Sequence, residues 1–172
     1  MCKNAEKWVF CIDQDFTWSS GLTITEDVAF LDLTGVRRLE LRRGGEVRVL
    51  KDYAWDGCTP KFCLLDLVFG IPDGVVDSRT KKPKTYYASM VHDALYQFLS
   101  DGLPLKRRDA DRCFLMLMSE TGFVLRYPYY WAVRLFGGMF RRIGKWKRKT
   151  SGRMILLKEQ AWKLRADETN VS

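Results

Sequence analysis

The sequence predicts an α+β fold, in which a small N-terminal antiparallel sheet is followed by about three helices. Short runs of β-branched and aromatic residues dominate up to about Thr59, and helical spacing of apolar residues takes over from Tyr86 onward. The chain has 172 residues, 47% of them hydrophobic, which is enough to bury one core. We therefore expect a single domain over residues 1–165 and a frayed polar tail over 166–172.

The strands are expected within residues 1–60, where they form antiparallel hairpins. Turn signals at Ser19-Ser20-Gly21, Thr34-Gly35 and Gly44-Gly45 separate the apolar runs. The segment "VRRLELRRGGEVRVL" alternates apolar and charged residues on both sides of the Gly-Gly pair. This alternation predicts a hairpin with one buried face and one face in water.

The helices are expected within residues 86–150, after the loop "FGIPDGVVDSRTKKPKT", which is rich in Pro, Gly, Asp and Ser. Apolar residues at helical spacing predict helices over 88–99, 105–119 and 128–147. Gly102-Leu103-Pro104 and Gly122 mark the breaks between them. Because the connection at Gly102 is short, the first two helices should be antiparallel neighbours.

The N-terminus and the cysteines indicate the compartment. The N-terminal segment has charges among its apolar residues and no run of signal-peptide length, and no other stretch is apolar for long enough to span a bilayer. The five cysteines are odd in number and irregularly spaced, which is typical of free thiols in a reducing compartment. We therefore expect a cytoplasmic protein, peripheral to a membrane at most.

The net charge of +8 is concentrated in the C-terminal third. No acid lies between Glu120 and Glu159, whereas ten Lys and Arg residues do. Three interpretations remain open: a solvated face of a core helix, a surface for anionic lipid headgroups, or a nucleic-acid site. Nucleic acid ranks last, because no recognised binding motif accompanies the charges. The candidate residues for a membrane or anion surface are Arg134, Arg141, Arg142, Lys145 and Lys147.

The segment "YYASMVHDALYQF" contains the only histidine of the chain. On a helix, Ser89, His92 and Tyr96 share one face, and Asp93 lies about 100° further around the axis. A zinc site with two or three histidines is excluded by counting, and so is a histidine-rich phosphohydrolase centre. A partly buried structural histidine and a catalytic one both remain open.

Four blocks in order carry a resemblance to a known family. They are "GEVRVLKDYAWDGCTPKF", "YYASMVHDALYQF", "RRDADRCFLMLMSETG" and "YYWAVRLFGG", which together span roughly residues 46–138. The chain resembles an uncharacterised family of domains of unknown function carried by bacteriophages and prophages (DUF one-three-five-three). The resemblance implies a phage origin, the cytoplasm of a bacterial host, and phage or host proteins as further partners. It implies no particular activity.

A second, more distant resemblance concerns chemistry. His-Asp-x-x-Tyr on one helix and Ala-Asp-x-x-Phe on the next are similar to the core of phospholipase A2 enzymes. The resemblance implies that His92 is a general base that activates water, and that Tyr96 and Asp111 orient its imidazole. It also implies Ca²⁺ as cofactor, with Asp93 as a ligand. The chain lacks the Gly-rich calcium loop of those enzymes, so Asp56 in "WDGCTP" is the candidate for the remaining ligand oxygens.

Two classes of function follow from these patterns. The first is a phage-encoded ester hydrolase that acts at a membrane surface through a pair formed by His92 and Asp111. The second is a non-catalytic accessory or morphogenesis protein, in which the same polar residues hold two helices together. The discriminating observation is whether the polar groups converge on an open pocket or on a closed network.

Overall fold

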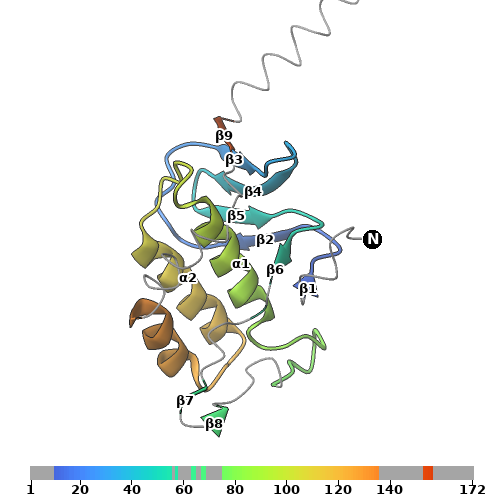
Figure 1. Cartoon of the computed structure of the whole chain (residues 1–172), viewed down its shortest axis with the longest axis vertical. Helices are drawn as coiled ribbons and strands as arrows, with labels where there is room; N and C mark the ends of the chain where they lie inside the picture. Colours follow the sequence, from blue (N-terminus) through green and yellow to red (C-terminus); the bar gives the residue numbers. More distant parts are fainter. Residues whose placement is uncertain are drawn as a thin grey trace, which may run out of the picture.

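A computed structural model of the protein describes residues 10–55, 57, 63–64, 67–68, 75–135 and 153–156. It confirms the α+β class, with antiparallel sheets first and helices afterwards (Figure 1). The strands are β1 (Phe10–Cys11), β2 (Phe16–Ser19), β3 (Val28–Leu31), β4 (Arg37–Arg42), β5 (Glu46–Val49), β6 (Ala54–Trp55), β7 (Cys63–Leu64), β8 (Leu67–Val68) and β9 (Arg153–Leu156).

The helices lie close to their predicted positions. They are α1 (Tyr86–Phe98), α2 (Arg107–Glu120) and a helical segment over residues 126–135. The third was expected over 128–147, and residues 136–147 lie outside the described part of the chain. At the start of α2, the Asp109 carboxylate accepts a hydrogen bond from the Lys106 backbone N–H at 2.9 Å, which caps the helix.

The main sheet has five strands in the order β2-β5-β4-β3-β9, and all neighbours in it are antiparallel. The predicted hairpin is the pair β4 and β5, which turns through Arg43, Gly44 and Gly45. One face of the sheet carries fully buried apolar side chains, as the alternation predicts. These are Val28, Phe30, Leu39, Leu41, Val47 and Val49.

Sequence patterning missed the short pair β7 and β8 and, far along the chain, the strand β9. Residues 153–156 pair with β3 and so place a late segment of the chain at the edge of the N-terminal sheet. The expectation that strands end near residue 60 is therefore incomplete. A four-residue strand after a strongly basic segment carries no clear periodicity, and its pairing is decided by the free edge of β3.

The helix α1 covers the buried face of the sheet, and α2 packs beside it (Figure 1). The Phe98 ring of α1 meets the Phe30 ring of β3 with centroids 5.2 Å apart. At the far end of α2, the Trp18 indole N–H donates to the Glu120 carboxylate at 2.9 Å. Both helices are therefore fixed to the sheet as well as to each other.

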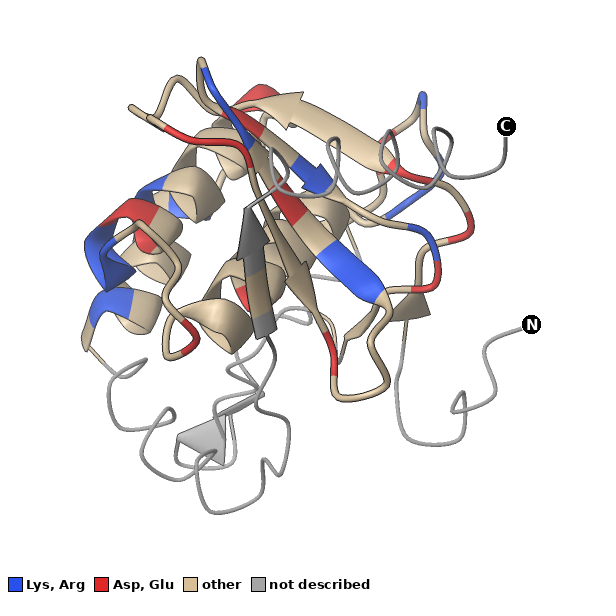
Figure 2. Cartoon of the chain, turned by 90° about the horizontal axis from the view of Figure 1, so that it is seen from above, with Lys and Arg blue, Asp and Glu red and all other residues tan. Residues whose placement is uncertain are grey.

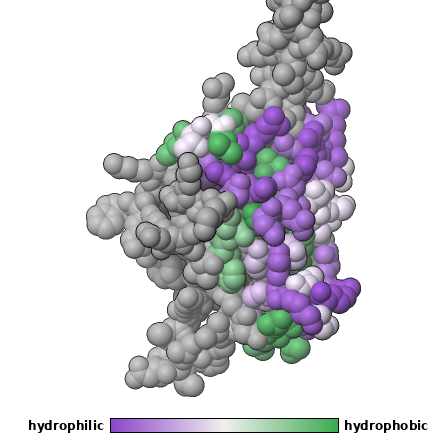
Figure 3. Space-filling view, turned by 90° about the vertical axis from the view of Figure 1, so that its right-hand side faces the viewer, coloured by the Kyte–Doolittle hydropathy of each residue, from purple (hydrophilic) through white to green (hydrophobic). Residues whose placement is uncertain are grey.

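The outward face of the sheet departs from the simple pattern at Glu40, which is only 2% exposed. Arg37 and Arg42 bond its carboxylate at 3.1 and 2.8 Å, and Arg48 lies 3.8 Å away. The three arginine side chains cover the Glu40 carboxylate, which explains why it is buried on the solvent-facing side of the sheet. Figure 2 shows both acidic and basic residues on the strands of the sheet. Among the described residues that Figure 3 shows, most of the surface is hydrophilic.

The cysteines only partly follow the expectation of free thiols. Cys113 is free and buried in α2, and burial raises the pKa of its thiol to about 12, so it is neutral at physiological pH. Cys11, in contrast, is disulfide-bonded. Among the described residues, no helix combines the length and the hydropathy that crossing a bilayer requires.

The turn between β4 and β5 generates a prediction. Gly44 and Gly45 both have positive φ, at 82° and 90°, but an added Cβ at Gly45 would lie 2.6 Å from the Leu22 carbonyl oxygen. A Cβ at Gly44 would meet nothing within 4 Å. Gly44→Ala should therefore lower the free energy of unfolding by about 1–2 kcal/mol, which is the cost of placing an L-residue in the left-handed region. Gly45→Ala should cost roughly a further 1–3 kcal/mol, because backbone must move.

Chemical denaturation of the two variants measures this difference, and Gly44→Ala is the matched control. An equal loss of stability in the two variants would contradict this prediction. It would show that the close approach of the Leu22 backbone to Gly45 adds nothing to the free energy that the positive φ angle costs.

Candidate active site

A buried carboxylate stands at the centre of the candidate site. Asp111 of α2 has no solvent exposure. Its Oδ1 atom lies 3.0 Å from His92 Nε2 and accepts a hydrogen bond from the Tyr96 hydroxyl at 2.5 Å. Its Oδ2 atom accepts a bond from Arg134 Nη1 at 3.0 Å. Side chains from α1 and from the helix 126–135 therefore converge on one acid of α2.

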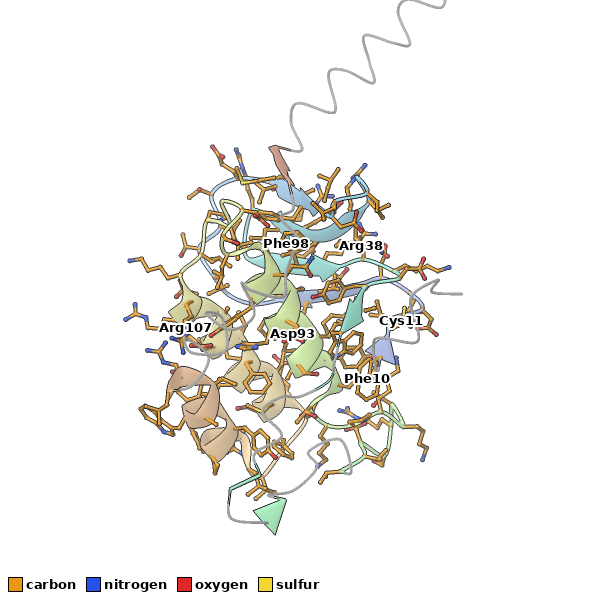
Figure 4. All side chains as sticks on the ribbon, viewed as in Figure 1. Phe10, Cys11, Arg38, Asp93, Phe98 and Arg107 are labelled. Carbon is orange, nitrogen blue, oxygen red and sulfur yellow. The ribbon has the colours of Figure 1, made fainter. Side chains whose placement is uncertain are left out.

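The helix geometry explains this convergence. His92 and Tyr96 are four residues apart on α1, so both project from one face. Arg107 at the start of α2 bonds Tyr96 late in α1, whereas Asp111 further along α2 bonds the earlier His92. The two helices are thus antiparallel, as the short connection at Gly102 predicts. Figure 4 shows Arg107 and Asp93 on these neighbouring elements.

Arg107 joins all three helices. Its Nε atom donates to the Tyr96 hydroxyl at 2.9 Å and lies 3.7 Å from Asp111 Oδ2. Its Nη2 atom donates to the backbone carbonyls of Val133 and Arg134 at 2.8 and 2.5 Å. Those carbonyls belong to the helix 126–135, so one guanidinium holds that helix against the site.

The hydrogen-bond network assigns the imidazole tautomer. Asp111 is an acceptor, so His92 must donate to it from Nε2, and the ring proton of the neutral form sits there. The Nδ1 atom then keeps its lone pair, and the nearest oxygen of the Asp93 carboxylate is 4.0 Å away. The ring packs against Tyr96 and Phe114, with centroid distances of 4.2 and 5.0 Å. The arrangement leaves His92 with one nitrogen able to accept a proton.

Electrostatics keep the central acid ionised. Burial by itself raises the pKa of Asp111, but hydrogen bonds from His92, Tyr96 and Arg134 outweigh it and leave that pKa below its usual value. Burial and the adjoining carboxylate raise the pKa of Tyr96 well above its ordinary value, so its hydroxyl stays protonated. Asp111 is therefore a permanent acceptor and Tyr96 a permanent donor at physiological pH.

The cluster extends from the protein surface into the core. The side-chain exposure is 31% at Asp93, 10% at His92 and zero at Asp111. An imidazole whose inner nitrogen is bonded to a buried carboxylate, and which is itself nearly covered, resembles the general-base arrangement of hydrolytic enzymes. It also resembles a satisfied structural network.

The structure brings together four of the candidate residues at Asp111, counting Asp111 itself, and does not describe five others. His92, Tyr96 and Asp111 meet as predicted. Asp93 lies next to the imidazole at 4.0 Å. Arg134 was expected on a basic surface, but the structure places its guanidinium on Asp111, because Arg134 follows the buried Val133 on the inner side of its helix. Asp56, Arg141, Arg142, Lys145 and Lys147 lie outside the described residues.

Sequence reasoning missed the contacts of Arg107 and Arg134 with Asp111. A signal was available for Arg107, which precedes Asp111 by four residues and so shares its helix face. No local signal was available for Arg134, because it lies 23 residues from Asp111, on a different helix and beyond a turn.

The described residues do not fit a calcium ion by themselves. Among them, no group of three or more His, Cys, Asp or Glu side chains could hold a metal. Calcium prefers six to eight oxygen ligands, and Asp93 offers one carboxylate. The calcium assignment, which also invokes Asp56, stays a prediction.

The buried carboxylate generates a second prediction. Asp111→Asn should lower the free energy of unfolding at pH 7 by about 3 kcal/mol, since it breaks a buried pair. The folded pKa of Asp111 is lowered, so its contribution is complete above the unfolded value of about 3.9 and is lost as the pH falls through the folded pKa. The stability difference between the two proteins should therefore shrink below about pH 4.

Denaturant unfolding at a series of pH values measures this difference. Asp15→Asn is the matched control, because Asp15 bonds Arg48 at 2.7 Å with both side chains 37% exposed, and its loss should cost about 1 kcal/mol or less. A cost at Asp111 no larger than at Asp15 would contradict a central role for this carboxylate.

In comparisons with protein-family models, with curated proteins and with solved structures, nothing matches the chain. The resemblances to the phage family and to phospholipase A2 therefore stay predictions, and the argument for function depends on the geometry of the site itself.

Proposed function

We propose that the protein is a hydrolase of carboxylic esters in which His92 is the general base. One observation carries this proposal: His92 Nε2 is 3.0 Å from a fully buried carboxylate, which leaves Nδ1 as an acceptor beside the partly exposed Asp93. An imidazole held in one tautomer by a buried acid is the arrangement by which hydrolases activate water.

The reaction would proceed in two steps. His92 Nδ1 takes a proton from water while the water oxygen attacks the ester carbonyl, and a tetrahedral intermediate forms. The intermediate then collapses, the bond to the alcohol breaks, and the leaving oxygen takes the proton back from His92. Asp111 stays ionised throughout and stabilises the imidazolium. The products are an acid and an alcohol, and one water is consumed.

The substrate class is proposed to be an ester at a lipid surface, in a phage context. The resemblance to phospholipase A2 supports a lipid ester, and the resemblance to the phage family supports a role in lysis or host interaction. The excess of bases between Glu120 and Glu159 supports attraction to anionic headgroups. Of the basic candidates, Arg141, Arg142, Lys145 and Lys147 carry this part of the proposal, since Arg134 is engaged by Asp111.

A second candidate function rests on the completeness of the network. Both oxygens of Asp111 have partners, and the acid has no exposure. Such a network is sufficient to hold three helices together, and in a non-catalytic accessory or morphogenesis protein it would need no other role. The experiment below separates the two functions, because a structural imidazole can be replaced by another donor and a base cannot.

We expect His92→Gln to remove ester hydrolysis by the purified protein, with a loss of about 10²–10⁴-fold. The Gln amide can still donate to Asp111, so folding should be retained, but it has no nitrogen that accepts a proton. Hydrolysis of a short-chain phosphatidylglycerol, followed by titration of the released acid, measures the effect.

Tyr96→Phe is the matched control. It keeps the ring packed on His92 and removes only the hydroxyl that donates to Asp111, so it should give a smaller loss than His92→Gln. Full activity in folded His92→Gln, or no hydrolysis by the unaltered protein, would favour the accessory function.

Calcium gives a separate prediction. If Asp93 contributes to a calcium site, millimolar Ca²⁺ should raise the melting temperature, because an ion bound only by the native state stabilises it by mass action. Asp93→Asn should abolish the increase, and Mg²⁺ should reproduce it poorly. The thermal shift is read by differential scanning calorimetry. An equal shift in Asp93→Asn would place the ion elsewhere, and no shift would remove calcium from the proposal.

A further inference from the structure

The helix 126–135 exposes a row of large apolar side chains. Val124, just before the helix, is 81% exposed, and Tyr127, Trp131 and Leu135 are 54%, 59% and 69% exposed. We call these four residues the apolar stripe. Their spacing is three, four and four residues, so they lie along one side of the helix.

The opposite side of the same helix packs on the protein. Val133 is 5% exposed, and the Tyr129 ring meets the Phe123 ring with centroids 5.5 Å apart. Inward burial therefore accounts for one side of the helix, whereas the apolar stripe stays exposed in the part of the chain that the structure describes. A contiguous row of exposed apolar side chains marks an interaction surface more often than scattered ones do.

We propose that the apolar stripe is the surface with which the protein docks on an anionic bilayer. This inference rests on the proposed function and names the part of the molecule that meets the lipid. Residues 121–135 contain no acid, and Arg126 is the base among them that Asp111 does not engage; eight further bases lie between residues 141 and 158. The Arg126 guanidinium lies over the Tyr127 ring, 4.9 Å from its centroid, so positive charge borders the stripe.

The composition of the stripe favours a bilayer over a protein partner. Tyr and Trp have apolar rings with one polar atom, and they are enriched at the level of lipid headgroups. A standard protein interface takes roughly 20–30 residues per partner, whereas one helix face with basic edges is the form of an interfacial helix. The stripe would insert at the boundary between headgroups and acyl chains, parallel to the surface.

The docking helix is joined directly to the candidate site. Arg134 precedes Leu135 of the stripe and donates to Asp111, and the Val133 carbonyl accepts from Arg107. The same helix therefore meets the lipid on one side and holds the partner of His92 on the other. This arrangement keeps the candidate base at a fixed position relative to the bilayer surface.

The test measures binding without hydrolysis, on vesicles of ether-linked phosphatidylglycerol and phosphatidylcholine. Trp131→Ser combined with Leu135→Ser should lower the partition coefficient on anionic vesicles by roughly tenfold or more, because buried apolar area is lost. Leu33→Ser is the matched control: Leu33 is 61% exposed in the turn between β3 and β4, far from the stripe in the sequence, and its loss should change binding less than twofold.

A milder variant covers the case in which the double variant fails to fold. Lipids brominated in the acyl chain quench tryptophans that reach them. Quenching of the unaltered protein should fall in Trp131→Phe, which keeps the stripe apolar and should bind the vesicles within about twofold of the unaltered protein. Unchanged quenching in Trp131→Phe would overturn the inference, because Trp131 would then not contact the lipid.

Three outcomes separate this inference from the proposed function. Binding that the stripe variant retains in full overturns the docking surface, even if His92-dependent hydrolysis is present. Stripe-dependent binding without hydrolysis supports the docking surface and contradicts the hydrolase. A shift from dimer to monomer in the stripe variant, seen by analytical ultracentrifugation without lipid, overturns the inference in favour of a second copy of the chain.

Discussion

The described structure depends on one buried charge. An isolated carboxylate with no solvent exposure would be strongly destabilising, so Asp111 requires donors on both of its oxygens. It obtains them from His92 and Tyr96 on α1 and from Arg134 on the helix 126–135. Apolar packing would allow small slides of three helices against one another, whereas directional bonds to a single acid allow one arrangement.

The same bonds create an asymmetry in the imidazole. The inner nitrogen of His92 is committed to Asp111, and the outer nitrogen is left as an acceptor beside Asp93. A purely structural histidine needs only the first of these features, since its second nitrogen would ordinarily find a donor or a carbonyl in a core. The partly exposed Asp93 carboxylate instead lies 4.0 Å from that nitrogen.

The helix 126–135 relates the site to the surface. Its inner side supplies Arg134 and the carbonyls that Arg107 binds, and its outer side presents the apolar stripe. The two sides follow from a single helical period, in which Val133 points inward while Trp131 and Leu135 point away from the core. Whatever binds the outer side therefore acts on an element that also holds the central acid.

The sequence by itself determined the α+β class, the hairpin at Gly44-Gly45, and the antiparallel positions of α1 and α2, while the meeting of His92 with Asp111 was implied by the resemblance to phospholipase A2. These features of the fold depend on short-range physics: strand alternation, helical spacing, and a short connection that returns α2 along α1. The tertiary structure alone decided the pairing of β9 with β3, the burial of Glu40 and the capture of Asp111 by Arg134. In each of these cases a free edge, or a buried charge far along the chain, selects the partner, and local periodicity carries no information about distant partners.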